Sequence, residues 1–199
     1  MIRVNPGGDS TTSAAPSESA SGGSGSTGDG VLTIGTVLPQ TGSLAFLGPP
    51  EFAGVDLALK EINAAGGVLG KEVVKIEGDS GDTSTNIASA TVDAGLAKGV
   101  DAFVGAASSS VSLTIIDKIT SAGVVQFSPA NTSIALTTYA DKGLYFRTAP
   151  PDTFQGAVLG QLVSNDGYTS AAVLALQDAY GEGLAKTFVE SFTGAGGTL

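Results

Sequence analysis

Three consecutive serines, at positions 108–110, are the residues whose types and spacing most clearly suggest chemistry. They follow the apolar segment 100–105 and precede segment 111–122, where aliphatic residues recur at helical spacing. A serine at such a junction can serve as a nucleophile, cap the helix, or donate to an anion at the positive end of the helix. The sequence has no histidine or cysteine, and GAASSSV does not match the G-x-S-x-G motif of serine hydrolases. We therefore do not expect an enzyme, while the cap and the anion site both stay open.

A second small polar segment, SPANTS at 128–133, follows the next apolar segment along the chain. Pro129 fixes the backbone and lacks an N–H, Ala130 offers backbone groups, and Thr132 can direct its hydroxyl into the same crevice as Ser109. Taken alone, the segment also fits an ordinary turn that caps a short helix. Two such loops at neighbouring strand ends favour a shared binding site for a small anion such as a carboxylate.

The remaining motifs give little support for a metal or a cofactor. Asp79 and Asp82 lack the spacing of a calcium-binding loop, and a helix cap plus a turn explains them. No glycine-rich motif typical of nucleotide binding is present. Tyr180, in the segment QDAYGEGLA, stands where a strand is expected to turn into a helix, so it either packs on its own helix or faces a ligand.

The elements that must position these residues follow from the hydrophobic pattern. Short apolar segments alternate with segments of helical periodicity from Val31 onward, which favours an α/β fold with a doubly wound parallel sheet and helices on both faces. The predicted strands are 31–39, 73–76, 100–105, 124–128 and 144–148. The predicted helices are 51–65, 82–98 and 111–122, with a short helical turn near 134–140. In such sheets ligands bind beyond the carboxyl ends of the strands, where both serine-containing loops are expected.

The pattern divides the chain into three parts. Residues 1–30 are rich in Gly, Ser and Thr and predict a disordered tether, and residues 31–150 predict one α/β lobe. Residues 151–199 contain a helix (153–165), a strand (171–176) and a second helix (180–192), which we interpret as the incomplete start of a second lobe. The segment 149–152, with two prolines, is the expected hinge.

Composition excludes several classes of partner. The 199 residues include 9 Lys and Arg against 19 Asp and Glu, for a net charge of −10, so we expect no nucleic-acid binding. No apolar run approaches the roughly 20 residues that a membrane-spanning helix needs, and we find no export signal in the sequence.

Several segments together resemble the extracellular solute-binding proteins of branched-chain amino-acid ABC transporters, which have the type I periplasmic-binding fold. The resemblance covers residues 31–199, and its most distinctive piece is LKEINAAGGVLGK. It rests on this piece together with GAASSS, SPANT, FRTAPPDTFQG and YGEGLA, in this order and spacing.

The resemblance implies a two-lobed protein that closes on an amino acid or a related small carboxylate and delivers it to a membrane permease. Ser109, Ala130 and Thr132 would hold the ligand's carboxylate and ammonium, with Ser110 as a neighbour. Tyr180 would cover the ligand from the second lobe, and the ligand-facing position of the first loop falls near Leu47. Ser108 or Ser110 would then cap the helix.

The same resemblance implies an extracellular, lipid-anchored or periplasmic location. The alternative is a ligand-sensing domain of the same fold in a receptor or regulator; a repressor would carry a basic helix-turn-helix before Val31, where this sequence has the tether. Because the second lobe is expected to be incomplete, we expect weak ligand binding or none, together with exposed apolar surface and poor solubility.

Overall fold

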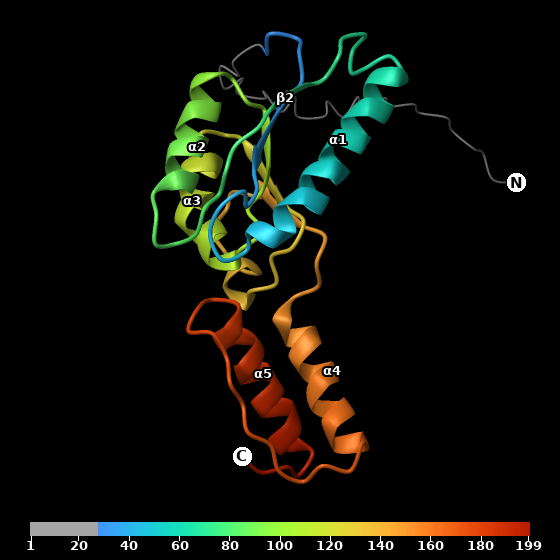
Figure 1. Ribbon diagram of the computed structural model, residues 1–199, viewed down its shortest axis with the longest axis vertical. Helices are drawn as coiled ribbons and strands as arrows, with labels where there is room; N and C mark the ends of the chain where they lie inside the picture. Colours follow the sequence, from blue (N-terminus) through green and yellow to red (C-terminus); the bar gives the residue numbers. More distant parts are fainter. Residues whose placement is uncertain (1–27) are drawn as a thin grey trace, which may run out of the picture.

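A computed structural model describes residues 28–199 (Figure 1). The predicted tether lies outside the described residues, apart from its last three, which are exposed and belong to no helix or strand.

Five parallel strands form one sheet, as the sequence predicts. They are β1 (Thr33–Val37), β2 (Val74–Ile76), β3 (Ala102–Gly105), β4 (Val125–Ser128) and β5 (Tyr145–Arg147), and their order across the sheet is β2-β1-β3-β4-β5. Because all neighbours are parallel, every strand ends at the same edge, where binding loops meet.

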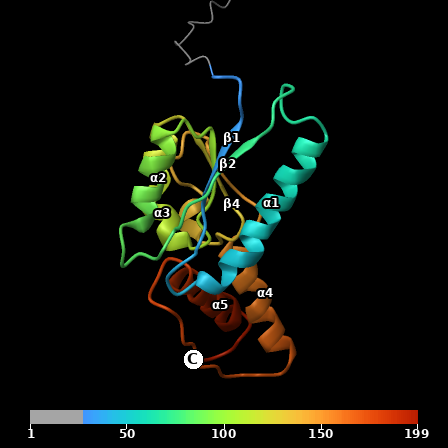
Figure 2. The same cartoon turned by 45° about the horizontal axis from the view of Figure 1, so that its top comes forward.

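Helices cover both faces of the sheet, which confirms the doubly wound α/β class. Helix α1 (Gly48–Ala64) lies on one face, and α2 (Ile87–Ala97) and α3 (Ser109–Ser121) lie on the other (Figures 1 and 2). The two 3₁₀ turns are η1 (Ala45–Leu47) and η2 (Ile134–Leu136). The main core packs α2 and α3 against the sheet through Val92, Phe103 and Ile115, each fully buried or nearly so. We call residues 31–148 the sheet body.

The second helix begins three or four residues later than the sequence predicts with Asp82 or Thr83 as its cap. Asp82 does not cap it; its carboxylate instead accepts hydrogen bonds from the backbone and hydroxyl of Ser84 and closes a separate turn. The helix therefore starts at Ile87 after Asn86. A local Asx-type turn competes with helix capping for the same carboxylate oxygens, and here the turn prevails.

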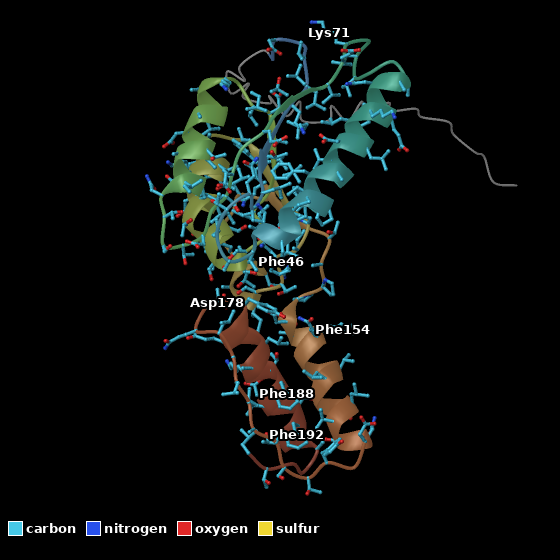
Figure 3. The ribbon with its side chains drawn as sticks, viewed as in Figure 1. Phe46, Lys71, Phe154, Asp178, Phe188 and Phe192 are labelled. Atoms are coloured by element: carbon cyan, nitrogen blue, oxygen red, sulfur yellow. The ribbon has the colours of Figure 1, made fainter. Side chains whose placement is uncertain are left out.

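Two further helices pack against each other beyond the sheet body. These are α4 (Asp152–Asn165) and α5 (Gly181–Gly194), which lie side by side in Figure 1. Close approach requires glycine at position 156, where a Cβ atom would lie 2.1 Å from Oγ1 of Thr187. On α5 the rings of Phe188 and Phe192 stack with centroids 5.6 Å apart (Figure 3).

The strand predicted at 171–176 is wrong. This segment has no strand assignment, and the nearest bridge joins Ser170, the residue before it, to Thr198. A strand needs neighbours to pair its backbone groups, and residues 28–199 provide none along 172–176. Leu174 and Leu176 are consequently 100% and 71% exposed, so the apolar surface expected here is present.

No helix within residues 28–199 is both long enough and apolar enough to cross a bilayer.

Candidate functional site

The carboxyl edge of the sheet borders a pocket of about 360 Å³ that also touches residues at the head of α5. Figure 3 shows the arrangement: Phe46 marks the lower end of the sheet body, and Asp178 and Phe154 mark the facing ends of the α5 and α4 segments. All six residues that the resemblance implicates lie in the wall of this one pocket: Leu47, Ser109, Ser110, Ala130, Thr132 and Tyr180. Their contact with a ligand stays a prediction.

Ser109 joins the two loops that the sequence pairs. Its side chain is almost fully buried, and its Oγ accepts hydrogen bonds from the backbone N–H groups of Thr132 and Ser133, each at 3.2 Å. A hydroxyl that accepts two such bonds still has its own hydrogen to donate. Ser109 therefore both fixes the second loop and keeps one donor for a further partner.

Ser108 is the N-cap of α3. Its Oγ accepts from the backbone N–H of Val111 at 3.4 Å, and it has the extended backbone usual for this position. The N–H groups of Ser109 and Ser110 belong to the first helical turn, where the helix offers them no carbonyl. Together with the positive end of the helix dipole, they form a wall suited to an anion.

The close approach of β3 to β1, just before the serine loop, requires glycine at position 105. Its φ is +129°, and a Cβ atom there would lie 2.0 Å from the carbonyl oxygen of Val37. Any larger residue would push β3 away from β1 and displace the loop that carries the serines.

A buried polar network holds the SPANTS loop against the serine loop. Asn131 is fully buried, and its Nδ2 donates to the carbonyls of Ala106 and Ala107 at 3.0 and 2.8 Å. Tyr145 donates to Oδ1 of Asn131 at 2.8 Å, and Ser128 donates to the Ala106 carbonyl at 2.7 Å. Burial raises the pKa of Tyr145 to about 12, so its phenol stays a donor at any physiological pH.

The backbone N–H of Ala130 is already used within the loop, since it donates to Oγ of Ser128 at 3.3 Å. The N–H of Thr132 is likewise used by Ser109. The groups that these two residues can still offer are the Ala130 carbonyl oxygen and the Thr132 hydroxyl.

Ser110 points to the other side of the pocket. Its Oγ accepts a hydrogen bond from the backbone N–H of Ala179 at 3.0 Å. Ala179 lies between Asp178 and Tyr180, both of which line the pocket.

The turn at Asp178–Tyr180 starts α5. Oδ1 of Asp178 accepts from the N–H of Gly181 at 2.7 Å, and a Cβ atom at Gly181 would lie 2.3 Å from the Leu176 carbonyl oxygen. Tyr180 lines the pocket and remains 39% exposed.

The charged side chains of the pocket wall are all acidic among the described residues. Among the described residues that line it, Asp82 and Asp178 are acidic and none is Lys or Arg. Asp152 lies nearby, fully buried, and its Oδ2 has no hydrogen-bond partner among the described residues. Burial raises the pKa of the Asp152 carboxyl and outweighs the opposing effects of hydrogen bonding from Thr132 and Gln155 and of the Arg147 charge. The side of the wall that carries Asp82 and Asp178 thus favours a positively charged group on the ligand.

The Asp79 carboxylate stabilises a turn by accepting hydrogen bonds from Gln40, Thr41 and Gly81. Partial burial would raise its pKa, but the hydroxyl of Thr41 and the N–H groups of Gly81, Gln40 and Thr41 donate to its carboxylate and hold the pKa below its usual range. Within residues 28–199, no group of three or more His, Cys, Asp or Glu side chains is placed to hold a metal ion.

Sequence reasoning missed Asn131 and Asp152. Asn131 stands inside the SPANTS segment, where an amide directly before two small hydroxyl residues was the available signal. Asp152 follows two prolines and begins α4, so it reads as a helix-start residue, and its full burial is a tertiary effect.

Comparison with known proteins finds related sequences along the whole described region. The family model described as "Periplasmic binding protein" matches residues 31–199. The Leu/Ile/Val-binding protein homolog 3 of Brucella melitensis is 32% identical over 159 residues, which cover 79% of this chain and 42% of that protein. This chain therefore spans less than half the length of that relative.

Solved structures of solute-binding proteins share the fold of this chain. The branched-chain amino acid transporter substrate-binding protein LivJ of Streptococcus pneumoniae, in complex with isoleucine, is 32% identical with a TM-score of 0.74; the match covers 85% of this chain and 48% of that one. A solute-binding protein of an ABC transporter from Rhodopseudomonas palustris, in complex with 3,4-dihydroxybenzoic acid, shares the fold with a TM-score of 0.75 at 21% identity, over 85% of this chain and 46% of that one.

Proposed function

Because this chain belongs to the periplasmic binding protein family, we propose that it is part of the substrate-binding component of an ABC importer and that its pocket receives a free amino acid. The observation that carries the proposal is the pocket wall itself. It combines first-turn N–H groups and hydroxyls at the start of α3 with acidic side chains and, among its described residues, no cation.

A zwitterion matches both halves of this wall. Its carboxylate would accept from the N–H groups of α3 and the hydroxyls of Ser109 and Thr132. Its ammonium would lie near the Ala130 carbonyl oxygen and the acidic residues Asp82 and Asp178. An acid without an ammonium group would offer no positive charge to Asp82 and Asp178, so we favour an amino acid over an aromatic acid.

The other lining residues favour an aliphatic or small side chain on the ligand. Leu44, Leu47 and Leu176 are the larger apolar residues there, and Tyr180 adds a ring with a polar end. Leucine, isoleucine and valine fit this mixture, which agrees with what the names of the relatives say of those proteins.

The mechanism is non-covalent. The sheet body would dock the zwitterion first, and the α4–α5 segment would then swing about the crossing at 149–152 to bring Tyr180 over it. We further propose that the closed form is presented to a membrane permease and that the protein works outside the cytoplasmic membrane, as the name of the family implies.

The ligand class can be tested with three matched small molecules and the ¹⁵N-labelled chain observed by NMR, which detects weak binding. L-Leucine should shift the amide signals of Ser109, Ala130 and Thr132. 4-Methylpentanoate, which is leucine without its ammonium, and 3-methylbutylamine, which is leucine without its carboxylate, should each bind at least about tenfold more weakly. Binding of 4-methylpentanoate or benzoate as tightly as leucine would overturn the amino-acid assignment.

A further inference from the structure

One hydrogen bond joins the sheet body to the α5 segment next to the pocket. The Ser110 hydroxyl accepts the N–H of Ala179, which lies 69 residues away in the sequence. Within residues 28–199, and apart from the contacts of Asp152 at the chain crossing, no other hydrogen bond connects residues up to 148 with those beyond it. Among the described residues, this bond is therefore the one hydrogen bond that joins the sheet body to the α5 segment at the pocket.

The residue that donates this bond belongs to a hydrogen-bonded turn. The Asp178 carboxylate accepts from Gly181 N–H, and the Asp178 carbonyl accepts from Glu182 N–H at 3.0 Å. The turn is thus fastened to the first turn of α5, and Tyr180 directly follows the bonded Ala179. Fixing the N–H of Ala179 consequently fixes where Tyr180 stands over the pocket.

We propose that Ser110 is a positioning residue: its hydroxyl docks the Asp178–Tyr180 turn and so sets the place of Tyr180 at the ligand. This role rests on the proposed function for its biological meaning, although the contact itself needs no ligand. The three adjacent serines then have different roles. Ser108 caps the helix, Ser109 joins the two loops, and Ser110 binds the turn on the opposite wall.

Hydrogen exchange of the Ala179 amide tests the contact without any ligand. One neutral hydrogen bond of this kind changes an equilibrium by about three- to tenfold. Ser110→Ala should accelerate exchange of the Ala179 amide by about that factor, and Ser110→Thr, which keeps a hydroxyl, should restore the slow exchange. Ser121→Ala, at the exposed last position of the same helix, is the matched control and should leave Ala179 unchanged.

Equal exchange of Ala179 in wild type, Ser110→Ala and Ser110→Thr would overturn the proposal. A circular dichroism spectrum identical to wild type confirms that Ser110→Ala is folded, and Ser110→Thr provides the second measurement.

Titration with L-leucine separates positioning from direct ligand contact. If Ser110 positions the turn, Ser110→Ala weakens leucine binding by about three- to tenfold together with the loss of Ala179 protection, and Ser110→Thr recovers both. Weaker binding with unchanged Ala179 protection would make Ser110 a direct ligand donor and contradict the proposal. Lost Ala179 protection with no leucine binding in the wild type would support the docking contact and overturn the proposed function.

Discussion

Oγ of Ser109 lies 3.2 Å from the backbone nitrogen of Thr132, and this bond joins the first turn of α3 to the loop after β4. Because the same oxygen also accepts the N–H of Ser133, it already receives two hydrogen bonds, and its own hydrogen stays available for a further acceptor. One side chain thereby shapes the site and supplies a donor to it.

Ser109→Ala should therefore affect both stability and binding. Two N–H groups would lose their acceptor in a largely buried place, so we expect the free energy of unfolding to fall by about 1–3 kcal/mol. Urea denaturation followed by circular dichroism measures this change, and Ser121→Ala on the exposed end of α3 should stay within about 0.5 kcal/mol of wild type. A Ser109→Ala protein as stable as wild type would show that the bridge between the loops contributes nothing.

Tyr145 should destabilise the fold at high pH. Its folded-state pKa is raised from 10 to about 12, so the stability that its neutral form confers is complete below pH 10 and is lost as the pH rises toward 12. The loss should reach about 2–3 kcal/mol. Stability measured between pH 9 and about 12 should fall less in Tyr145→Phe, which cannot ionise; identical pH profiles would contradict the burial of this phenol.

Glu51 should likewise lose its contribution to stability as the pH rises, but around neutral pH, because burial disfavours its charged carboxylate. Burial raises its pKa from 4.5 to about 7, and its Oε2 has no hydrogen-bond partner among the described residues. The neutral form is favoured, so its contribution is complete below pH 4.5 and is lost as the pH rises through 7.

We expect Glu51→Gln to raise the melting temperature at pH 8 and to leave it nearly unchanged at pH 4. The same exchange at the exposed Glu61 on α1 should show no such pH dependence. A melting-temperature gain that is equal at both pH values would indicate a cause other than ionisation.

Two glycine-to-alanine exchanges should have opposite signs. Gly156→Ala places a Cβ atom 2.1 Å from Thr187 Oγ1 and 2.7 Å from the Phe188 backbone nitrogen, and should cost about 1–3 kcal/mol by forcing α4 and α5 apart. Gly54→Ala, in the middle of α1 with nothing within 4 Å, should stabilise by about 0.5–1 kcal/mol. Urea denaturation of both variants measures the pair, and a loss at Gly54 or a gain at Gly156 would contradict this packing.

The sheet could be predicted because apolar strand segments and helical stripes alternate regularly from Val31 to Thr148. The failures occurred where distant parts of the chain decide the outcome. The segment 171–176 has the composition of a strand, yet no described neighbour pairs with it along its length. Asp82 has the type of a helix cap, yet its oxygens are taken by Ser84.

The sequence predicted which residues line the candidate site, but it did not predict which role each serine has. Small hydroxyl residues at two strand ends indicated a shared pocket, and the structure brings Ser109, Ala130 and Thr132 to its wall. Ser109 accepts a hydrogen bond from a loop 23 residues downstream, and Ser110 accepts one from a turn 69 residues downstream. The local sequence around the serines gives no sign of these distant partners. The burial of Asn131 and Asp152 is likewise visible only after the chain is folded.

The most direct test of the central claim is where L-leucine binds on this chain, mapped by ¹⁵N chemical-shift changes at millimolar ligand. We predict saturable changes at the amides of Ser109, Ala130 and Thr132, with a dissociation constant of the order of 1 mM, or about −4 kcal/mol. The absence of any change, or changes confined to residues outside the pocket, would contradict the assignment of this pocket as an amino-acid site.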